Sequence, residues 1–183
     1  MAIVDLARNT LVLKVVLAGP PAVGKSTRLD QIGVEGKRMR FGSRLTGESE
    51  LATLPLASEG SVRPVELEIY EWHGPEKADL RARALFTGLD GIIYIADARE
   101  DRHGDTRGQF HFLVENAGKT RVHRLPGLLL LGHLDEGLLR LSSFEKDLVG
   151  PTWSERLEVG IEEHEKFMEA IKLFGEVMLA RAL

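Results

Sequence analysis

Residues 11–32 read LVLKVVLAGPPAVGKSTRLDQI and carry the clearest structural signal in this chain. Residues 11–18 are apolar except for Lys14, which is typical of a buried strand, and residues 25–32 have the spacing of a helix. Between them, Gly19 to Ser26 match the pattern G-x-x-x-x-G-K-[ST]. A strand, a glycine-rich turn and a helix in this order predict backbone amides that converge at a helix N-terminus.

This turn predicts a site for a nucleoside triphosphate and Mg²⁺. The amides from Ala22 onward would face the β-phosphate, Lys25 would reach the β- and γ-phosphates, and the Ser26 hydroxyl would be a magnesium ligand. Pro20 and Pro21 lack N–H groups, but they precede the amides that matter. The alternative is a structural turn that happens to carry Lys and Ser. The predicted nucleotide-binding residues here are Gly19, Ala22, Val23, Gly24, Lys25, Ser26 and Thr27.

The rest of the chain alternates strand-like and helix-like segments. Because the strand-like runs are apolar on both faces, they predict an α/β three-layer sandwich with a mostly parallel sheet and helices on both faces. We expect one domain over residues 1–183. The predicted strands are 11–18, 51–56, 65–72, 91–97 and 125–131, and the predicted helices are 25–32, 76–87, 105–117 and 157–180.

Three of these segments carry more detailed expectations. Residues 33–60, apart from the short strand, are expected to form an irregular, mobile loop. Residues 65–72 alternate apolar and polar side chains, which favours an edge or near-edge strand. Residues 157–180 predict a long closing helix, whose core-facing positions would be Leu157, Ile161, Met168, Ile171, Phe174 and Met178.

Composition narrows the classes of partner and compartment. The chain has 183 residues, no cysteine and a formal charge of -4, with 24 basic and 28 acidic residues mixed along it. Such a charge favours neither nucleic acid nor an anionic membrane as the main partner. No apolar run approaches the ~20 residues of a membrane span, so we expect a cytoplasmic protein without an integral membrane segment.

Two further clusters follow predicted strands. Glu71, His73 and Gly74 end one strand, and His133 and Asp135 follow another. Because ligands of open α/β sheets bind at the carboxyl ends of the strands, we expect both clusters near the glycine-rich turn of residues 19–26, the phosphate turn. Glu71 would reach Mg²⁺ through water. His73 is a candidate catalytic residue because histidine commonly acts as a general acid or base, although a solvent-facing histidine is the commoner case.

The segments LVLKVVLAGPPAVGKSTRLDQI and GLDGIIYIADARED, with the spacing between Gly74 and Gly91, resemble the Ras-like small GTPases. The resemblance is strongest to the bacterial MglA type and more distant to Arf-like proteins, and it covers residues 11–135. It implies a P-loop NTPase of the small G-protein fold that binds GTP or GDP with Mg²⁺. It also implies a protein partner of the Roadblock fold at the switch regions and a role in cell polarity or motility.

The resemblance also assigns roles to single residues. Gly74 would lie at the γ-phosphate and Asp135 would accept two hydrogen bonds from guanine, with His133 beside the base. The family has Asp, Gln, Asn and Lys where this chain has Glu71, Pro75, Gly132 and His133. Since proline cannot orient water, we expect a weak GTPase with slow or partner-assisted hydrolysis.

Several assignments stay open at this stage. In one interpretation Asp135 recognises the guanine base, and in another its side chain caps the following turn. The last guanine-contacting loop is placed at residues 152–155. The threonine that senses the γ-phosphate, and that would join the metal site, is Thr46 or Thr53, with a solvated loop threonine as the alternative.

Two other functions remain. One is a degenerate GTPase-fold scaffold or binding module with little or no hydrolysis. The other is a small-molecule ATP kinase, in which Asp97 at the end of a buried strand would act on the metal.

Overall fold

The computed structural model describes residues 3–43, 47–56, 62–74 and 85–182. The strands in these ranges are β1 (Ile3–Asp5), β2 (Thr10–Ala18), β3 (Lys37–Ser43), β4 (Gly47–Leu56), β5 (Val65–Glu71), β6 (Gly91–Asp97), β7 (Pro126–Gly132) and β8 (Thr152–Glu158). The helices are α1 (Lys25–Glu35), α3 (His103–Ala117), α4 (Lys119–Val122) and α5 (His164–Ala182). Short 3₁₀ turns lie at Glu100–Arg102 and Leu141–Phe144.

The described strands form one mixed, mostly parallel sheet in the order β3-β4-β5-β2-β6-β7-β8, with β1 paired to β2. Strands β5, β2, β6, β7 and β8 run parallel to their neighbours among these five. Strands β1, β3 and β4 pair antiparallel. Because the five parallel strands share one direction, their carboxyl ends meet at a single edge of the sheet.

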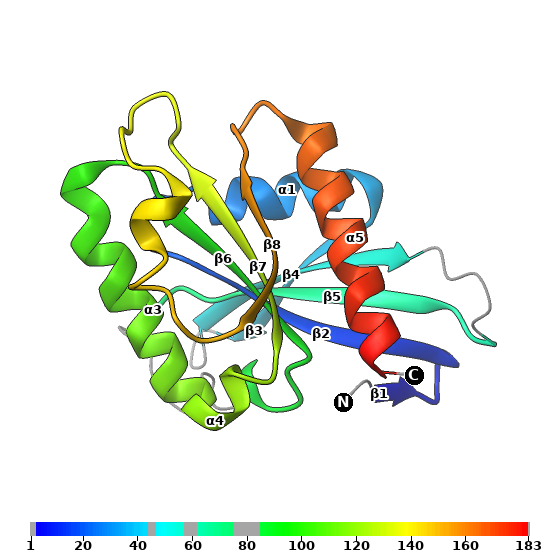
Figure 1. Cartoon of the computed structure of the whole chain (residues 1–183). Coiled ribbons are helices and arrows are strands. Elements are labelled where there is room, and N and C mark those ends of the chain that lie inside the picture. The colour runs from blue at the N-terminus through cyan, green and yellow to red at the C-terminus, as the bar shows by residue number, and fades with distance from the viewer. Residues whose placement is uncertain (1–2, 44–46, 57–61, 75–84, 183) are drawn as a thin grey trace.

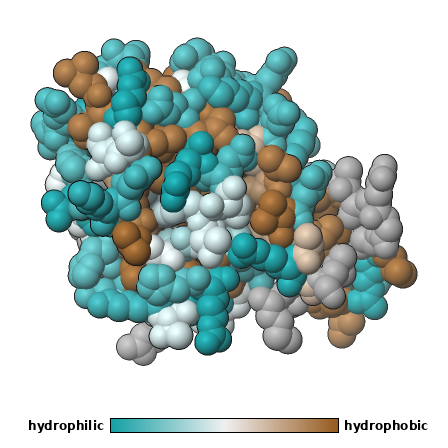
Figure 2. All heavy atoms as spheres, viewed as in Figure 1, coloured by the Kyte–Doolittle hydropathy of each residue, from teal (hydrophilic) through white to brown (hydrophobic). Residues whose placement is uncertain are grey.

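Helices cover both faces of the sheet (Figure 1). Helices α1 and α5 pack on one face over a core that includes Leu29 and Phe174. Helix α3 packs on the other face over a core that includes Phe110 and Tyr94. In Figure 2 hydrophilic residues cover much of the visible face, with apolar residues scattered between them. The prediction of an α/β fold with helices on both faces of a mostly parallel sheet is confirmed.

The predicted irregular loop over residues 33–60 is wrong where the structure describes it. Helix α1 continues to Glu35, and β3 and β4 form an antiparallel pair. Arg38 and Arg40 of β3 both form ion pairs with Glu50 of β4. This cross-strand charge match stabilises a segment that looks too polar for a strand. The strand expected at residues 51–56 is the second half of β4.

The prediction places β5 at or near an edge of the sheet, and the strand is the third from the edge that β3 forms. It lies between β4 and β2. The carboxylates on its polar face have partners within the chain: Arg8 reaches Glu66 at 2.7 Å and Glu68 at 3.0 Å, and the Tyr70 hydroxyl donates to Glu68 at 2.7 Å. The alternation of apolar and polar residues therefore correctly indicated that one face of the strand is polar, but it did not give the position of the strand in the sheet.

The closing helix begins later than predicted. Leu157 belongs to β8, and Ile161 is 47% exposed in the connection that follows. Helix α5 starts at His164. The alternation in TWSERLE favours a strand, and Gly160 ends it. The other predicted core-facing positions are buried as expected: Met168, Ile171, Phe174 and Met178.

The remaining elements agree with the prediction within two or three residues, namely β2, α1, β6, α3 and β7. Of the helix expected at 76–87, residues 76–84 lie outside the described residues, and Leu85 and Phe86 are helical. Among the described helices, none combines the length and apolar character that a bilayer span requires.

Candidate functional site

The glycine-rich turn joins the end of β2 to the start of α1 and leaves the helix N-terminus open. Gly24 precedes the helix in a left-handed conformation with φ of 90°. Within the described residues, no side chain caps this end and the first turn holds no acidic residue. The free amides and the positive end of the helix dipole therefore remain available to an anion. Gly19 is required by space, because an added Cβ would lie 2.5 Å from the Ile95 carbonyl oxygen.

Lys25 is folded back into the turn. Its Nζ donates to the carbonyl oxygens of Gly19 at 2.9 Å and Pro20 at 2.8 Å, and the residue is 6% exposed. Burial lowers the pKa of Lys25, while the negative charge of Glu71 acts in the opposite direction. The ammonium group thus lies at the centre of the turn, held by carbonyl groups that a stronger acceptor can replace.

The two predicted magnesium ligands lie in direct contact. The Ser26 hydroxyl lies 3.1 Å and 3.0 Å from the two carboxylate oxygens of Glu71, to which it can donate. Glu71 is the last residue of β5 and is 3% exposed. His73 Nδ1 lies 3.4 Å from Glu71 Oε1, and its side chain is 40% exposed. A hydroxyl and a carboxylate at one point form the oxygen set that Mg²⁺ prefers, so the residues present fit this ion.

Gly74 lies directly beyond this group. Its φ is 95°, and an added Cβ would lie 2.7 Å from Gln109 Oε1 on α3. The positive φ favours glycine, and a larger residue would also displace the end of the Gln109 side chain. The Gln109 oxygen is buried and lacks a hydrogen-bond partner among the described residues.

The loop after β7 lies against the phosphate turn. His133 has φ of 55°, and its Nε2 lies 2.9 Å from the Ala22 carbonyl oxygen. The amides of Glu136 and Gly137 donate to the His133 carbonyl. This turn is thus closed by main-chain groups, and Asp135, which is exposed, has no capping bond among the described residues. The capping interpretation of Asp135 gains no support from this geometry.

A pocket of about 500 Å³ opens between the two loops. The phosphate turn and the loop after β7 form two of its walls, and the connection from β8 to α5 forms the third. Its lining includes Ala22, Val23, Gly24, Thr27, Arg28, Gly132, His133, Asp135, Gly160, Ile161 and Glu162. The predicted nucleotide-binding residues of the two loops therefore come together around one hollow, with Lys25 and Ser26 on the same turn.

Arg28 fixes the third wall, which the sequence interpretation missed. It is 4% exposed and donates to the carbonyl oxygens of Val159 at 2.8 Å and Gly160 at 2.9 Å, and its guanidinium lies 4.5 Å from the centre of the Phe167 ring. Burial lowers its pKa to about 10. The predicted third loop at residues 152–155 is wrong, because Thr152 begins β8 and the pocket lies beyond its carboxyl end. The glycine after the alternating TWSERLE segment was the available signal.

Neither threonine proposed as a sensor of the γ-phosphate is placed at this site by the described residues. Thr46 lies outside the described residues. Thr53 lies in the middle of β4, buried, opposite Glu68 of β5 and therefore three residues before Glu71 along that strand. The structure does not bring Thr53 to Ser26.

Asp97 is paired with Arg99. It is fully buried at the end of β6, and Arg99 donates to its two oxygens at 3.0 Å and 2.7 Å. Burial opposes ionisation, but the Arg99 contacts outweigh it and lower the pKa of Asp97. Since Glu71 and not Asp97 contacts Ser26, the geometry offers the kinase interpretation little support.

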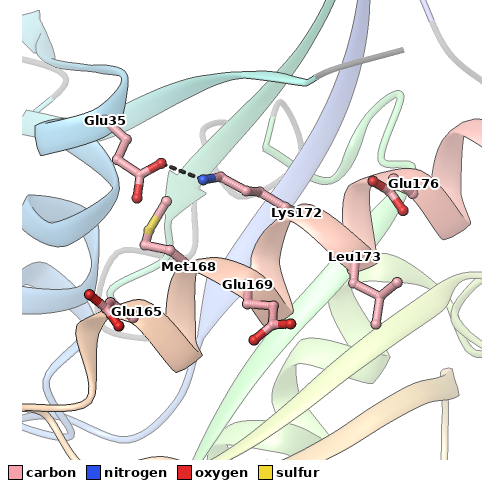
Figure 3. A pocket seen from close by; sticks show the side chains of 7 residues that line it. All are labelled: Glu35, Glu165, Met168, Glu169, Lys172, Leu173 and Glu176. Carbon is pink, nitrogen blue, oxygen red and sulfur yellow. Dashed lines mark hydrogen bonds and ion pairs between the residues drawn. The ribbon is translucent and has the colours of Figure 1, made fainter. Parts of the chain in front are cut away.

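A second hollow of about 470 Å³ lies between the end of α1 and α5 (Figure 3). Its lining carries Glu35, Glu165, Glu169 and Glu176 against a single cation, Lys172, which is paired with Glu35 at 2.5 Å. Of these two hollows, only the pocket of about 500 Å³ is lined by residues of the glycine-rich turn.

Comparisons with protein families and with curated proteins identify no relative of this chain. No protein-family model matches the chain, and no curated protein matches it. The functional argument therefore depends on the residues and geometry of the site.

Proposed function

We propose that this chain is a guanine-nucleotide-binding P-loop protein of the small G-protein fold, similar to the MglA type. It would bind GTP or GDP with Mg²⁺ and act as a molecular switch with slow or partner-assisted hydrolysis. The observation that carries the proposal is the contact between Ser26 at the start of α1 and Glu71 at the end of β5. It places two hard oxygen ligands beside an uncapped helix N-terminus and a buried lysine.

The phosphate part of the proposal follows from the turn. The amides after Ala22 and the N-terminus of α1 offer donors to a β-phosphate, and phosphate oxygens are stronger acceptors for Lys25 than the two carbonyls it now contacts. When bound, Mg²⁺ would neutralise charge on the phosphates, with Ser26 as a ligand and Glu71 holding a ligand water. Both side chains already face the same point, so little rearrangement is needed.

The base part follows from the pocket. Asp135 lines it, and a carboxylate accepts hydrogen bonds from the guanine N1–H and amino group. Adenine has an acceptor at N1, so it would leave this carboxylate poorly matched. Asp135 therefore favours guanine, although Gly132 replaces the asparagine expected from the resemblance.

The hydrolysis rate is proposed to be low without a partner. Pro75 stands at the position where the resemblance predicts a water-positioning glutamine. His73, whose Nδ1 lies 3.4 Å from Glu71 Oε1, is the candidate catalytic side chain in this proposal. A cytoplasmic location, a Roadblock-type partner and a role in polarity or motility come from the resemblance and belong to the same proposal.

Nucleotide titration tests the proposal. Fluorescent GDP, GTP and ATP analogues are titrated against the wild-type chain and against Lys25→Ala, with Lys119→Ala in the exposed helix α4 as the matched control. We expect tight binding of both guanine nucleotides, weak binding of ATP, and loss of binding in Lys25→Ala alone. Undiminished binding by Lys25→Ala, or a preference for ATP, would contradict the proposal.

A scaffold without nucleotide exchange is the second candidate. One observation favours it: the Lys25 ammonium and the Ser26 hydroxyl are already satisfied by groups of the chain itself. The same titration separates the two functions, because a scaffold would bind neither guanine nucleotide with Mg²⁺-dependent affinity.

A further inference from the structure

Two side chains of α1 hold the third wall of the pocket by its carbonyl oxygens. The Arg28 guanidinium donates to Val159 at 2.8 Å and to Gly160 at 2.9 Å. Gln31 Nε2 donates to the next carbonyl oxygen, that of Ile161, at 2.7 Å. Arg28 also donates to Gln31 Oε1 at 2.9 Å, so it orients the side chain that holds the third carbonyl. Three successive acceptors of the wall are therefore bound to one helix.

The burial of Arg28 depends on these contacts. The residue is 4% exposed, and among the described residues its guanidinium forms no ion pair and lies on the face of the Phe167 ring. Burying a charged group is costly unless hydrogen bonds compensate for the lost water. The hydrogen bonds that compensate here are the ones to the two wall carbonyls and to Gln31. The same bonds that make the burial possible thus fix the orientation of the wall.

These contacts also determine which amides of the wall remain free. A peptide group is planar and trans, so its N–H points away from its C=O. With the carbonyls held by α1, the N–H groups of Ile161 and Glu162 point away from the two α1 side chains. The Gly160 amide donates to Glu163 Oε2 at 2.6 Å, whereas those of Ile161 and Glu162 have no acceptor among the described residues. Both residues line the pocket, so two main-chain donors of this wall remain for a ligand.

We propose that Arg28 and Gln31 are positioning residues that give the pocket its preference for a base. The inference rests on the proposed binding of a guanine nucleotide. Guanine carries an oxygen acceptor at the position where adenine carries an amino donor. A wall whose free main-chain groups are donors therefore favours guanine only while its peptide groups are held in this orientation. Helix α1 then serves both parts of the nucleotide, the phosphates through its first turn and the base through Arg28 and Gln31.

The test compares ligands that differ in the base. Affinities for GDP, ADP and inorganic pyrophosphate, each with Mg²⁺, are measured by isothermal titration for the wild type, Arg28→Lys and Gln31→Leu. Lysine keeps the charge but lacks the planar set of donors, and leucine keeps the size of glutamine but lacks the donor. We expect GDP affinity to fall about tenfold in Arg28→Lys and about fivefold in Gln31→Leu, in line with one or two lost hydrogen bonds. The affinities for ADP and pyrophosphate should stay within about twofold of the wild type.

A matched control and a second variant keep this test decisive. Val34→Ala changes a side chain of the same helix that is 79% exposed, and it should leave all three affinities unchanged. Because Gln31 is only partly buried, Gln31→Leu gives the answer even if Arg28→Lys does not fold.

Hydrogen exchange separates positioning from a general loss of structure. The exchange of the Ile161 and Glu162 amides is followed by NMR in the free protein, with GDP and with pyrophosphate. We expect GDP to slow this exchange in the wild type and pyrophosphate to leave it unchanged, because only GDP brings an acceptor to the wall. In Gln31→Leu the slowing by GDP should be smaller.

The outcomes distinguish this inference from the proposed function. Wild-type discrimination between GDP and ADP in both variants would overturn the positioning role and leave the proposed function intact. A loss of pyrophosphate affinity parallel to that of GDP would also overturn it, because the effect would then not concern the base. Absence of guanine-nucleotide binding by the wild type would overturn the proposed function and this inference with it.

Discussion

The two loops that form the pocket are stabilised over different distances in the chain. In the phosphate turn, Lys25 bonds to Gly19 and Pro20, six and five residues away. In the part of the pocket that we propose holds the base, His133 bonds to Ala22, and Arg28 bonds to Val159 and Gly160. These contacts span more than 100 residues of the chain. A contiguous motif can form the local contacts of the phosphate turn, whereas the contacts of His133 and Arg28 form only when three distant segments pack together. The phosphate turn should therefore respond to single local changes, and the base part to changes that loosen the packing.

The largest effect is expected at Lys25. Lys25→Ala removes the cation that faces the phosphates, and we expect guanine-nucleotide affinity to fall by roughly a hundredfold or more, since charge-assisted bonds to phosphate are the strongest in such a site. Ser26→Ala should give a smaller loss that appears only with Mg²⁺. Isothermal titration with and without the ion measures both. Equal losses in the two conditions for Ser26→Ala would contradict the assigned metal role.

Arg28 tests whether the third wall depends on a long-range contact. Arg28→Met leaves the carbonyls of Val159 and Gly160 without their donor, and we expect the free energy of unfolding to fall by about 3 kcal/mol. Urea denaturation measures the loss. Arg124→Met, at an exposed position after α4, is the control and should be nearly neutral. A stability for Arg28→Met close to that of the control would show that the wall holds without this side chain.

Asp135 tests base selection apart from phosphate binding. Asp135→Asn replaces one of the two carboxylate oxygens by an NH₂ donor, and we expect GDP affinity to fall by about thirtyfold, because one hydrogen bond to the base is lost and two donors then face each other. Affinity for inorganic pyrophosphate should not change, because Asp135 belongs to the loop after β7 and not to the turn that is proposed to hold the phosphates. Competition titrations compare the two ligands. A parallel loss for pyrophosphate would mean that the two loops do not act separately.

Substitutions at two glycines are expected to give the smallest changes in the free energy of unfolding, with opposite signs. Gly74→Ala meets Gln109 at 2.7 Å and keeps a positive φ, so we expect a loss of about 1–2 kcal/mol in unfolding free energy. Gly108→Ala lies in α3 with no atom within 4 Å of the new Cβ, and it should gain about 0.5–1 kcal/mol because alanine favours a helix interior. Thermal unfolding of both variants checks the signs. A gain at Gly74 would show that the chain after β5 relaxes freely.

The sequence anticipated the phosphate turn better than the base pocket. Strand, turn and helix are local, and their residues follow one another from Leu11 to Ile32, so pattern and spacing were sufficient. Glu71 was placed correctly because strand ends of a parallel sheet meet at one edge. Arg28 was missed because its partners are carbonyl groups more than 100 residues away, and main-chain acceptors leave no mark in a sequence.

The amino-acid sequence by itself determined the α/β alternation, the open helix N-terminus and the side chains that could face a polyphosphate. These depend on local periodicity and on the conformational freedom of a few glycines. The tertiary structure alone decided that β5 is interior, that β3 and β4 pair, and that Gly160 to Glu162 complete the pocket. Each of these depends on pairing between distant segments, whose free energy comes from cross-strand ion pairs, buried hydrogen bonds and packing that no short stretch of sequence contains.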